Sequence, residues 1–522
     1  MPKKTFKDLA SIGIVRDTDP FELPGQAWSR GQNVRFMDGA VHKSDGHSAV
    51  FGVPSVTPYW MLPVQTESAY YWLYAGLNKV YTVSGGVHSN ITRQTASVDV
   101  NYSATADHNW NGGILSGIPV INNGVDDPQV WSPVSASTRL VSLKWDATDT
   151  WSTKNWSAKV IRPFLNYLIA LDITKVGTRH KHLVAWSHPA AAGTLPISWD
   201  AADPTVQANE RDLGQTPGNL VDCLPLGSNT NVIYKEDSTY LMRPFGGADV
   251  FSIAPAFQSI GALSRRCIVE FESKHAVLGF GDFIVHDGLN IQSPLDKRLK
   301  NWLFKNMDSN AYMRSFLVPN YDRNEIWICF PQLGASFPNA AIIWNYRDNT
   351  AAIRELQDTP HIGFGVVDPS TVLTWDNATG TRDAATAPWD VRSYNPTLKR
   401  LLMASANNLF ILDDTERFNG NNMNAYVERT GLDFDDEFRM KYIDKIRINA
   451  TATGAINIEV YHQEHRNAPL ETLISGTFDP NNDEWFDCDV EGRFIGFRFG
   501  SASDISWSIR SFEVEYQYAG AY

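Results

Sequence analysis

The chain of 522 residues is longer than one ordinary hydrophobic core can serve, so its length predicts several domains or a repeat fold. Its 43% hydrophobic and 20% charged residues are typical of a folded soluble protein, and no apolar run approaches the ~20 residues that span a bilayer. The net charge of −13 argues against a protein that grips nucleic acid by its phosphates, because that role needs a basic surface. The N-terminal Met1–Lys7 lacks the apolar core of a signal peptide.

A short strand, a polar or glycine-containing turn and a second short strand recur along the chain. The seven copies are Tyr70–Val83, Gly117–Trp131, Phe164–Trp186, Asn231–Met242, Ala276–Val285, Glu325–Tyr346 and Arg400–Leu412. β-prone runs on either side of turn residues are typical of hairpins. Most copies start about 48 residues apart, which matches the blade period of a β-propeller, and two longer intervals indicate inserted loops. We therefore predict an all-β fold with a β-propeller of about six or seven blades; a pair of β-sandwiches is the alternative.

The last 90 or so residues lie outside this repeat and alternate between apolar and polar positions, as in Ile456–Tyr461 and Ile505–Arg510. Alternation indicates strands with one buried and one solvated face, so we predict a C-terminal antiparallel β-sandwich. The expected domains are an N-terminal segment at 1–55 that contacts the propeller, a propeller with insertions at 56–427 and a sandwich at 428–522. Helix is scarce, and the better candidates are Lys297–Met307 and Glu437–Asp444.

The densest histidine cluster is His180, His182 and His188. Residues two apart on a strand share a face, so His180 and His182 could reach one metal ion. His188 precedes a proline and is expected in the turn beyond that strand. Because no acidic or cysteine partner lies nearby in sequence, we favour solvated strand histidines over a metal site. A second pair, His462 and His465, is expected at a polar strand end or turn.

The chain also carries three short charged stretches and four cysteines. The acidic run Asp433, Asp435, Asp436 and Glu437 lacks the spacing of a calcium loop and is expected to be a solvated loop. The basic stretches Lys297–Lys300 and Arg265-Arg266 are too small for a nucleic-acid surface and are expected at subunit contacts or at exposed positions. Four widely spaced cysteines predict reduced, mostly buried thiols: Cys223, Cys267, Cys329 and Cys488.

No nucleophile elbow, Walker loop or HExxH sequence is present. We therefore predict no catalytic, cofactor-binding or metal-binding residue, no cofactor, and a protein that is not an enzyme.

Several segments in order along the chain resemble one family. They are Leu23–Phe36 with Asp38-Gly39 and Gly46, Ile121–Trp131, Ala185–Pro189 with Ile197–Asp200, Gly261–Arg265, Val285–Gly288, Asn324–Cys329 and Gly492–Phe499. Together they resemble the tail nozzle proteins of podoviruses, also called tail tubular B or packaged-DNA stabilization proteins. The resemblance also offers His188 a role in a blade turn, without a metal.

The resemblance implies a structural subunit of the tail of a short-tailed bacteriophage. Such a protein forms a homohexameric nozzle ring that extends the DNA channel below the portal and adaptor, and it helps to retain and then release the genome. Expected partners are the portal and adaptor (which residues 1–55 could contact), tail fibre or spike proteins, and double-stranded DNA that passes without sequence-specific binding. The expected location is the virion tail, after assembly in the host bacterial cytoplasm. An acidic channel lining would let DNA slide by denying it phosphate partners.

Two rival functions remain open from the sequence. One is a glycan-binding or glycan-cleaving propeller of the virion, which would use exposed Trp and Tyr side chains and a converging pair of carboxylates. The S-x-D-x-G-x-x-W repeat of propeller sialidases is missing from the sequence. The other rival is a propeller that serves only as an interaction module.

Overall fold

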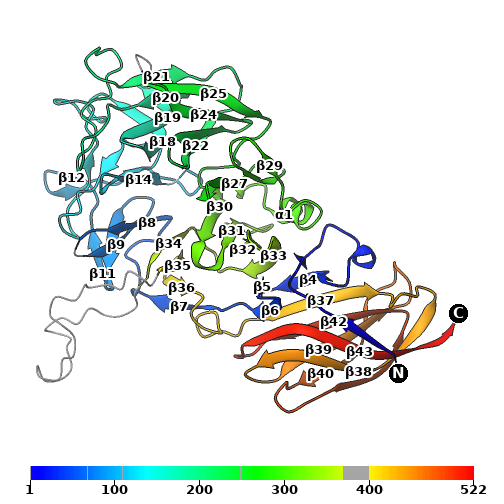
Figure 1. Cartoon of the computed structure of the whole chain (residues 1–522). Coiled ribbons are helices and arrows are strands. Elements are labelled where there is room, and N and C mark those ends of the chain that lie inside the picture. Colours follow the sequence, from blue (N-terminus) through cyan, green and yellow to red (C-terminus); the bar gives the residue numbers. More distant parts are fainter. Residues whose placement is uncertain (1, 68, 109, 247–249, 368–398, 522) are drawn as a thin grey trace, which may run out of the picture.

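The computed structural model describes residues 2–67, 69–108, 110–246, 250–367 and 399–521. A β-propeller and a β-sandwich lie side by side in an elongated molecule, and both termini lie at the far end of the sandwich (Figure 1). Within the described residues, helix is limited to α1 (Lys300–Asn306) and the single 3-10 turns η1 (Pro20–Glu22), η2 (Tyr312–Arg314) and η3 (Tyr321–Arg323). The all-β prediction is confirmed.

The propeller has seven antiparallel blades among the described residues, numbered here in chain order. Blade 1 contains β8 (Trp60–Gln65), β9 (Tyr70–Ala75), β10 (Val80–Ser84) and β11 (Val87–Asn90), and blade 2 contains β14 (Asn111–Leu115), β15 (Ile118–Asn122), β16 (Gln129–Val130) and β17 (Val141–Ser142). Blade 3 contains β18 (Trp156–Phe164), β19 (Tyr167–Lys175), β20 (Thr178–Trp186) and β21 (Asn209–Asp212). Blade 4 contains β22 (Leu220–Leu226), β23 (Thr230–Lys235), β24 (Ser238–Pro244) and β25 (Phe251–Gln258). A small hairpin, β12 (Gln94–Thr95) with β13 (Val98–Asp99), lies between blades 1 and 2.

Blades 5 to 7 complete the ring. Blade 5 contains β26 (Ile268–Phe271), β27 (Lys274–Leu278), β28 (Phe283–His286) and β29 (Ile291–Gln292). Blade 6 contains β30 (Phe316–Asn320), β31 (Glu325–Phe330), β32 (Ala340–Asn345) and β33 (Thr350–Glu355). Blade 7 contains β34 (Ile362–Val366), β35 (Lys399–Ala404), β36 (Leu409–Leu412) and β7 (His47–Val50). The first strand of each blade contacts the first strand of the next, and β34 contacts β8, so the ring is closed. The outer strand of blade 7 is β7, which comes from the N-terminal segment and pairs with β36.

Each of the seven hairpins predicted from sequence is the pair of middle strands of one blade. Middle strands are covered on both faces by neighbouring blades and are paired on both edges, so they carry the most apolar residues. Some outer strands are only two residues long and largely exposed, such as β17 and β29, and are too short to give a sequence pattern. The long interval after blade 3 comes from the loop between β20 and β21; the one in blade 7 falls on residues 368–398, outside the described residues.

The sandwich combines strands from both ends of the chain. One sheet has the order β41 (Phe486–Gly492), β38 (Arg439–Ala452), β43 (Trp507–Ala521), β6 (Ala40–Lys43) and β5 (Val34–Met37), with β1 (Lys3–Phe6) also on β43. The other has the order β4 (Arg30–Gln32), β37 (Ala425–Leu432), β42 (Phe494–Ser501), β39 (Ile456–Gln463) and β40 (Glu471–Phe478). The N-terminal segment thus supplies four strands to the sandwich.

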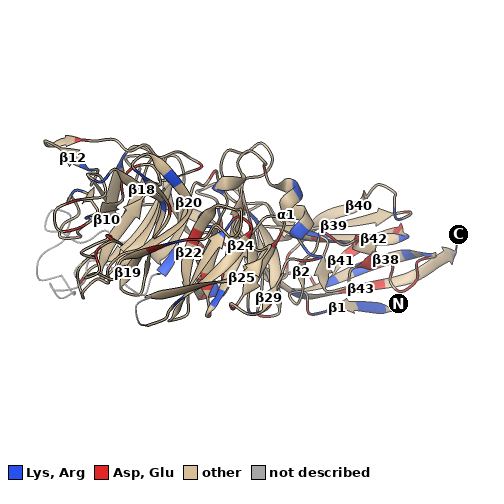
Figure 2. Ribbon diagram, turned by 90° about the horizontal axis from the view of Figure 1, so that it is seen from above, with Lys and Arg blue, Asp and Glu red and all other residues tan. Residues whose placement is uncertain are grey.

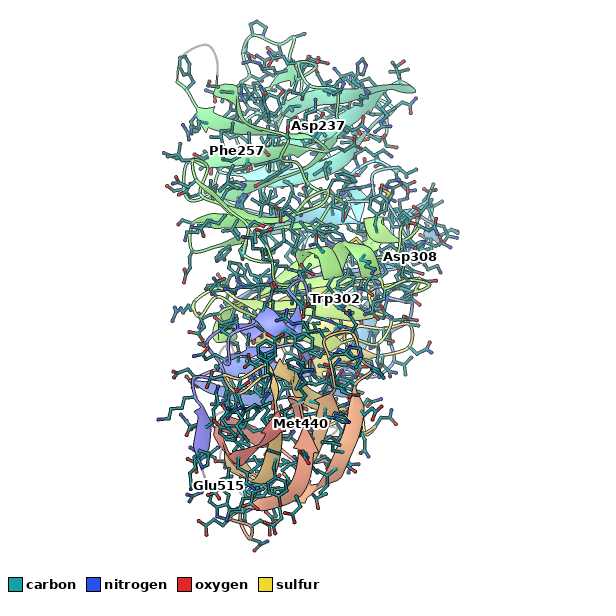
Figure 3. The ribbon with its side chains drawn as sticks, turned by 90° about the vertical axis from the view of Figure 1, so that its right-hand side faces the viewer. Asp237, Phe257, Trp302, Asp308, Met440 and Glu515 are labelled. Atoms are coloured by element: carbon teal, nitrogen blue, oxygen red, sulfur yellow. The ribbon has the colours of Figure 1, made fainter. Side chains whose placement is uncertain are left out.

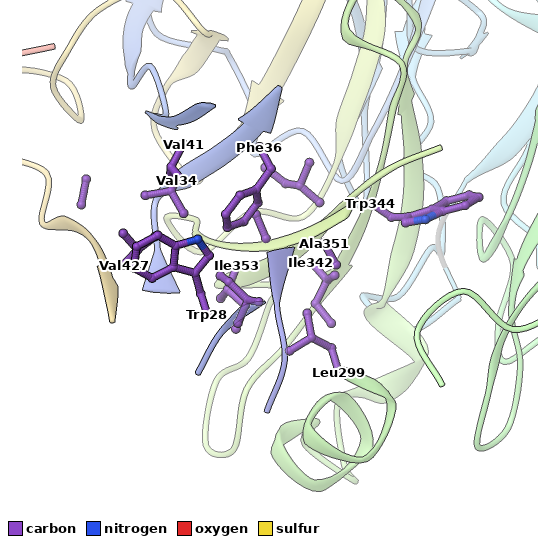
Figure 4. Close-up of a cluster of buried hydrophobic side chains, with 14 of the residues drawn as sticks. Trp28, Val34, Phe36, Val41, Leu299, Ile342, Trp344, Ala351, Ile353 and Val427 are labelled. Atoms are coloured by element: carbon purple, nitrogen blue, oxygen red, sulfur yellow. The ribbon is translucent and has the colours of Figure 1, made fainter. Parts of the chain in front are cut away.

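The same N-terminal segment also extends blade 6. The parallel strands β2 (Gly13–Ile14) and β3 (Ala27–Trp28) continue its sheet beyond β33. Gly13 has a φ of +87°, and a Cβ there would lie 2.7 Å from the carbonyl oxygen of Ala351, so this contact requires glycine. One buried apolar cluster consequently runs from blade 6 into the sandwich, and Figure 4 shows Trp28 and Val427 beside Ile353 of β33.

A buried ionic network joins the propeller to the sandwich. Arg35 on β5 donates to both carboxylate oxygens of Asp413 at 2.8 and 2.7 Å, and from Nε to Glu325 on β31 at 2.8 Å. Arg354 on β33 donates to Asp413 Oδ1 at 3.1 Å, and Arg323 Nε lies 3.4 Å from Asp413 Oδ2. The arginines hold the pKa of Asp413 well below its usual range, although burial opposes this. Asp413 is therefore a charged hub between two blades and the sandwich.

Of the two predicted helices, one is confirmed and one is wrong. The segment Lys297–Met307 contains α1, and the N–H groups of its second and third residues, Asn301 and Trp302, donate to the Asp17 carboxylate at 2.7 and 2.9 Å. The segment Glu437–Asp444 instead runs into strand β38, where buried and part-exposed residues alternate. Tertiary pairing with β41 and β43 on either edge decides this strand.

Candidate functional site

Polar side chains from the inner strands, and from the segments that precede them, make contacts between the blades. Arg162 on β18 donates from Nε and Nη2 to the two carboxylate oxygens of Asp222 on β22, at 2.8 and 2.6 Å. Its Nη1 donates to the carbonyl oxygen of Gly112 on β14 at 2.7 Å. A bidentate guanidinium–carboxylate pair fixes both side chains in one geometry. Arg162 therefore ties blades 2, 3 and 4 together.

Arg266 reaches across the propeller from the segment before β26. Its Nη1 donates to the carbonyl oxygen of Tyr59 at 3.2 Å and lies 3.5 Å from that of Pro360. Tyr59 directly precedes the inner strand of blade 1, and Pro360 closely precedes that of blade 7. The carbonyl oxygen of Arg266 also accepts from the N–H of Leu317 in blade 6 at 2.8 Å. One residue of blade 5 thus contacts three other blades.

Arg265 turns inward in the opposite direction, toward blades 2 and 3. Its Nη1 donates to the carbonyl oxygen of Lys159 on β18 at 2.9 Å, and its Nη2 lies 3.2 Å from Nδ1 of His108. Lys159 Nζ in turn donates to the carbonyl oxygen of Gly124 at 2.9 Å. Arg265-Arg266 was expected at a subunit contact or at exposed positions. The exposed alternative is wrong, because the chain before β26 directs both guanidinium groups into the fold, and the subunit contact stays a prediction. We call Lys159, Arg162, Asp222, Arg265 and Arg266 the axial cluster.

The axial cluster contains four cations and one carboxylate. Burial lowers the pKa of Arg265 and of Arg266 to about 10, so both remain charged at neutral pH. The pKa of Lys159 is also lowered, first by burial and then by repulsion from Arg265. Asp222, fully buried, is held by Arg162. The hydrogen bonds of this arrangement hold neighbouring blades in fixed positions relative to one another.

The three clustered histidines differ in their surroundings. His180 is exposed on β20 and His182 is partly buried on the same strand. His188 lies beyond the strand, where its N–H donates to the carbonyl oxygen of Ser198 at 2.8 Å and its Nδ1 accepts from the N–H of Gln207 at 3.1 Å. His188 therefore anchors the loop that leads to β21, and its expected place in a blade turn is confirmed. Across the described ranges, no three His, Cys, Asp or Glu side chains come close enough to hold a metal ion.

The acidic run between β37 and β38 is a loop, as predicted. Asp435 pairs with Lys4 at 2.7 Å, and Asp436 Oδ1 accepts from the N–H of Phe438 at 3.0 Å. Glu437 lies 3.3 Å from Arg466 of the loop after β39. These contacts hold the loop against its neighbours. Elsewhere, His462 lies at the end of β39, 3.3 Å from Glu471, and His465 lies in the turn that follows.

The four cysteines are confirmed as buried free thiols. Burial raises the pKa of the Cys223 and Cys488 thiols to about 12 and that of Cys267 to about 11. A thiol with so high a pKa is a poor nucleophile at neutral pH.

Sequence reasoning missed a buried hydrogen-bond chain between blades 4 and 5. Gly288 N–H donates to Nδ1 of His286 at 3.2 Å, so Nε2 of His286 carries the proton that it donates to the Tyr234 hydroxyl at 2.6 Å. Tyr234 donates to Nδ1 of His275 at 2.7 Å, and His275 Nε2 donates to the carbonyl oxygen of Pro225 at 2.7 Å. Burial lowers the pKa of both histidines to about 4. The available signal was their position at the two ends of the predicted hairpin Ala276–Val285, among apolar residues.

No family model and no curated protein matches the chain. Solved structures similar to it include PorZ, a bacterial surface component of the type-IX secretion system of Porphyromonas gingivalis, at 9% identity and a TM-score of 0.36, over 82% of this chain and 46% of that chain. The alignment thus spans less than half of PorZ. A streptogramin B lyase aligns at 11% identity and a TM-score of 0.36, over 79% and 97% of the two chains. YCF48 from Cyanidioschyzon merolae aligns at 8% identity and a TM-score of 0.29, over 51% and 78%.

At such low similarity these structures carry no argument about function, and the propeller rests on its own sheets and ring contacts. In the described part of the chain, no helix has the length and hydrophobicity needed to span a bilayer. That the chain is not an enzyme stays a prediction.

Proposed function

We propose that this chain is a structural subunit of a short-tailed bacteriophage tail. Six copies form a nozzle ring that extends the DNA channel below the portal and adaptor and helps to retain and then release the genome. The proposal starts from the ordered segments that resemble podovirus tail nozzle proteins. Its location is the virion tail, with tail fibre or spike proteins as further neighbours.

The observation that carries the proposal furthest is the path of the N-terminal segment. Its strands β1, β4, β5 and β6 pair within the sandwich, β2 and β3 extend blade 6, and β7 closes blade 7. Asp413 adds a charged link between the same parts, and one buried apolar cluster is shared by them. Separating the two bodies would require breaking strand pairs, ion pairs and an apolar core together. A subunit of a tube that holds DNA under pressure needs this rigidity.

The distribution of charge also supports the proposal. Basic and acidic residues are interspersed along the ribbon, with neither sign gathered on one body in this view (Figure 2). Many arginines are bound internally, including Arg35, Arg162 and Arg354, and are therefore not available to grip phosphates. DNA that passes a surface of net charge −13 finds few phosphate partners, which favours sliding.

The test is to locate the chain in virions. Antibodies against the full chain, detected by gold labelling and by averaging of labelled particles, should mark a sixfold ring at the distal tail. Particles assembled without the chain should package DNA and then lose it. Labelling elsewhere, or particles that keep their DNA without the chain, would contradict the nozzle. Sugars released from host polysaccharide by the purified chain would instead favour the glycan-cleaving alternative.

A further inference from the structure

One sheet of the sandwich ends in a strand that has a neighbour on one side only. β40 is the last strand of its sheet and pairs with β39. The sheet begins with β4, which contacts β33 of the propeller, so β40 lies at the end away from the propeller (Figure 1). Across the described ranges, no backbone group outside β39 forms a hydrogen bond with the backbone of β40. Its free edge therefore presents N–H and C=O groups that can pair with another strand.

The composition of β40 distinguishes it from the other long edges. Three strands that end a sheet away from the propeller axis have more than four residues, namely β25, β40 and β41. Proteins usually protect an exposed edge with a charge, a proline or a very short strand. Pro255 interrupts β25, and three carboxylates lie in β41. From Thr472 to Phe478, β40 has neither a charged residue nor a proline. Its edge is open to the addition of a strand.

The sandwich holds this edge in place from its inner side. Phe478 is buried and Ile474 is half-buried, whereas Ser475 and Thr477 are exposed. A Cβ at Gly476 would lie 2.7 Å from the ring of Phe486, so the glycine lets β41 of the opposite sheet pack closely on β40. Figure 3 labels Met440 of β38 and Glu515 of β43, which belong to that opposite sheet. An added strand would continue both the apolar inner face and the polar outer face.

The chain around the open edge is strongly acidic. Residues 471–492, from β40 through the next loop to the end of β41, contain seven carboxylates and no lysine, arginine or histidine. Glu471 lies 3.3 Å from His462, and Glu484 lies 3.6 Å from Arg447. The other five form no ion pair with a described residue, and they are Asp479, Asp483, Asp487, Asp489 and Glu491. We call residues 471–492 the acidic edge.

Three cations lie close to the acidic edge, and each has a carboxylate partner. Lys3, Lys445 and Arg447 surround the ring of Trp485, at 4.8, 4.6 and 5.7 Å from its centre. Lys3 and Lys445 lie 2.8 and 3.7 Å from Glu515 on β43, and Arg447 is the partner of Glu484. The acidic edge therefore keeps an excess of negative charge.

This charge selects what pairs with β40. Antiparallel pairing of β40 with the β40 of a second copy would place the two acidic edges alongside one another, and they would repel. A strand with acidic side chains would be repelled in the same way. A strand with basic side chains would be attracted, because opposite potentials meet across the interface.

We propose that the open edge of β40 is a docking site for an extended basic segment of another protein, which joins the sheet as a further strand. The backbone of this segment pairs with β40. Its apolar side chains continue the inner face beside Ile474 and Phe478, and its lysine or arginine side chains face the carboxylates of the acidic edge. The inference does not rest on the proposed role in a phage tail.

The experiment is hydrogen exchange of the full chain with a synthetic peptide that has the length of β40 and alternates valine and lysine. The peptide is N-methylated along one edge, so that it can pair with one strand only. It should slow amide exchange in Glu471–Phe478, and its affinity, followed by fluorescence anisotropy, should fall several-fold as the ionic strength is raised. One control peptide is methylated along both edges, which keeps the charge and prevents pairing. The other alternates valine and glutamate. Neither control should slow exchange in β40.

A pair of variants tests the contribution of the carboxylates. The double variant Asp487→Asn with Glu491→Gln removes two exposed charges from the acidic edge and should bind the basic peptide several-fold more weakly. Its matched control, Asp322→Asn with Asp348→Asn, removes two exposed charges from blade 6 and should bind like the parent chain.

Four results would overturn the proposal. Equal protection by the peptide methylated along both edges would show that charge alone holds it, and equal protection by the valine–glutamate peptide would show that charge does not select the strand. Slower exchange of β40 at higher protein concentration, without peptide, would identify a second copy as the occupant. Equally tight peptide binding by the two double variants would show that the acidic edge takes no part.

Discussion

Asp413 offers the most direct test of how the propeller and the sandwich are joined. It lies at the end of blade 7, where Arg35 and Arg354 donate to it within 3.1 Å and Arg323 lies 3.4 Å away. Replacement by asparagine keeps the shape and removes the charge, so the arginines lose their shared partner. Breaking a buried ion pair from one side costs about 3–5 kcal/mol. Asp413→Asn should therefore lower the free energy of unfolding in urea by that amount.

The matched control is Asp435→Asn, which removes a carboxylate from an exposed pair with Lys4 and should change stability little. The pKa of Asp413 is lowered in the folded chain, so its stabilising effect is present above the pKa of an unfolded aspartate and is lost as the pH falls below it. The difference between parent and Asp413→Asn should accordingly shrink below about pH 4. If Asp413→Asn is no less stable than Asp435→Asn at pH 7, the network does not hold the two bodies together.

Four further predictions follow from buried groups. Tyr234→Phe leaves ring nitrogens of His275 and His286 without partners and should lower the free energy of unfolding by about 1–3 kcal/mol in urea denaturation. Because buried histidines have a folded pKa of about 4, below the unfolded value of 6.5, stability should fall as the pH is lowered through this interval, by about 1.4 kcal/mol per pH unit for each. Gly13→Ala should lower the unfolding temperature, since its Cβ would meet a backbone oxygen at 2.7 Å in a left-handed conformation. The four thiols should react with a thiol reagent slowly in the native chain and fully after unfolding.

Each of these has an outcome that would contradict it. A Tyr234→Phe chain as stable as the parent would show that the hydrogen-bond chain is not needed, and a stability that rises on acidification from pH 6.5 to 4 would contradict neutral buried histidines. Gly520→Ala, where a Cβ has open space, is the control for Gly13→Ala and should be neutral. Rapid labelling of any native thiol would show that its burial is transient.

The sequence by itself determined the parts of the fold that are local. Hairpins such as Tyr70–Val83 and Ala276–Val285 were visible because the middle strands of a blade are buried on both faces and therefore carry apolar runs broken by turn residues. The alternating strands of the C-terminal sandwich could be predicted because each strand has one buried face and one solvent-exposed face. Burial of the cysteines followed from their spacing and type.

Tertiary structure alone decided which distant segments pair. The residues His47–Val50 pair with β36 in blade 7, and Arg30–Gln32 pair with β37 in the sandwich. Neither pairing could be predicted from the sequence, because strand pairing between segments hundreds of residues apart leaves no local pattern. The sequence also did not predict that the charged side chains of Arg265 and Arg266 point into the fold. Nor did it predict that Glu437–Asp444 runs into strand β38, since that strand is stabilised by pairing with β43. Local propensity sets what a segment can form; the partners that cover it set what it does form.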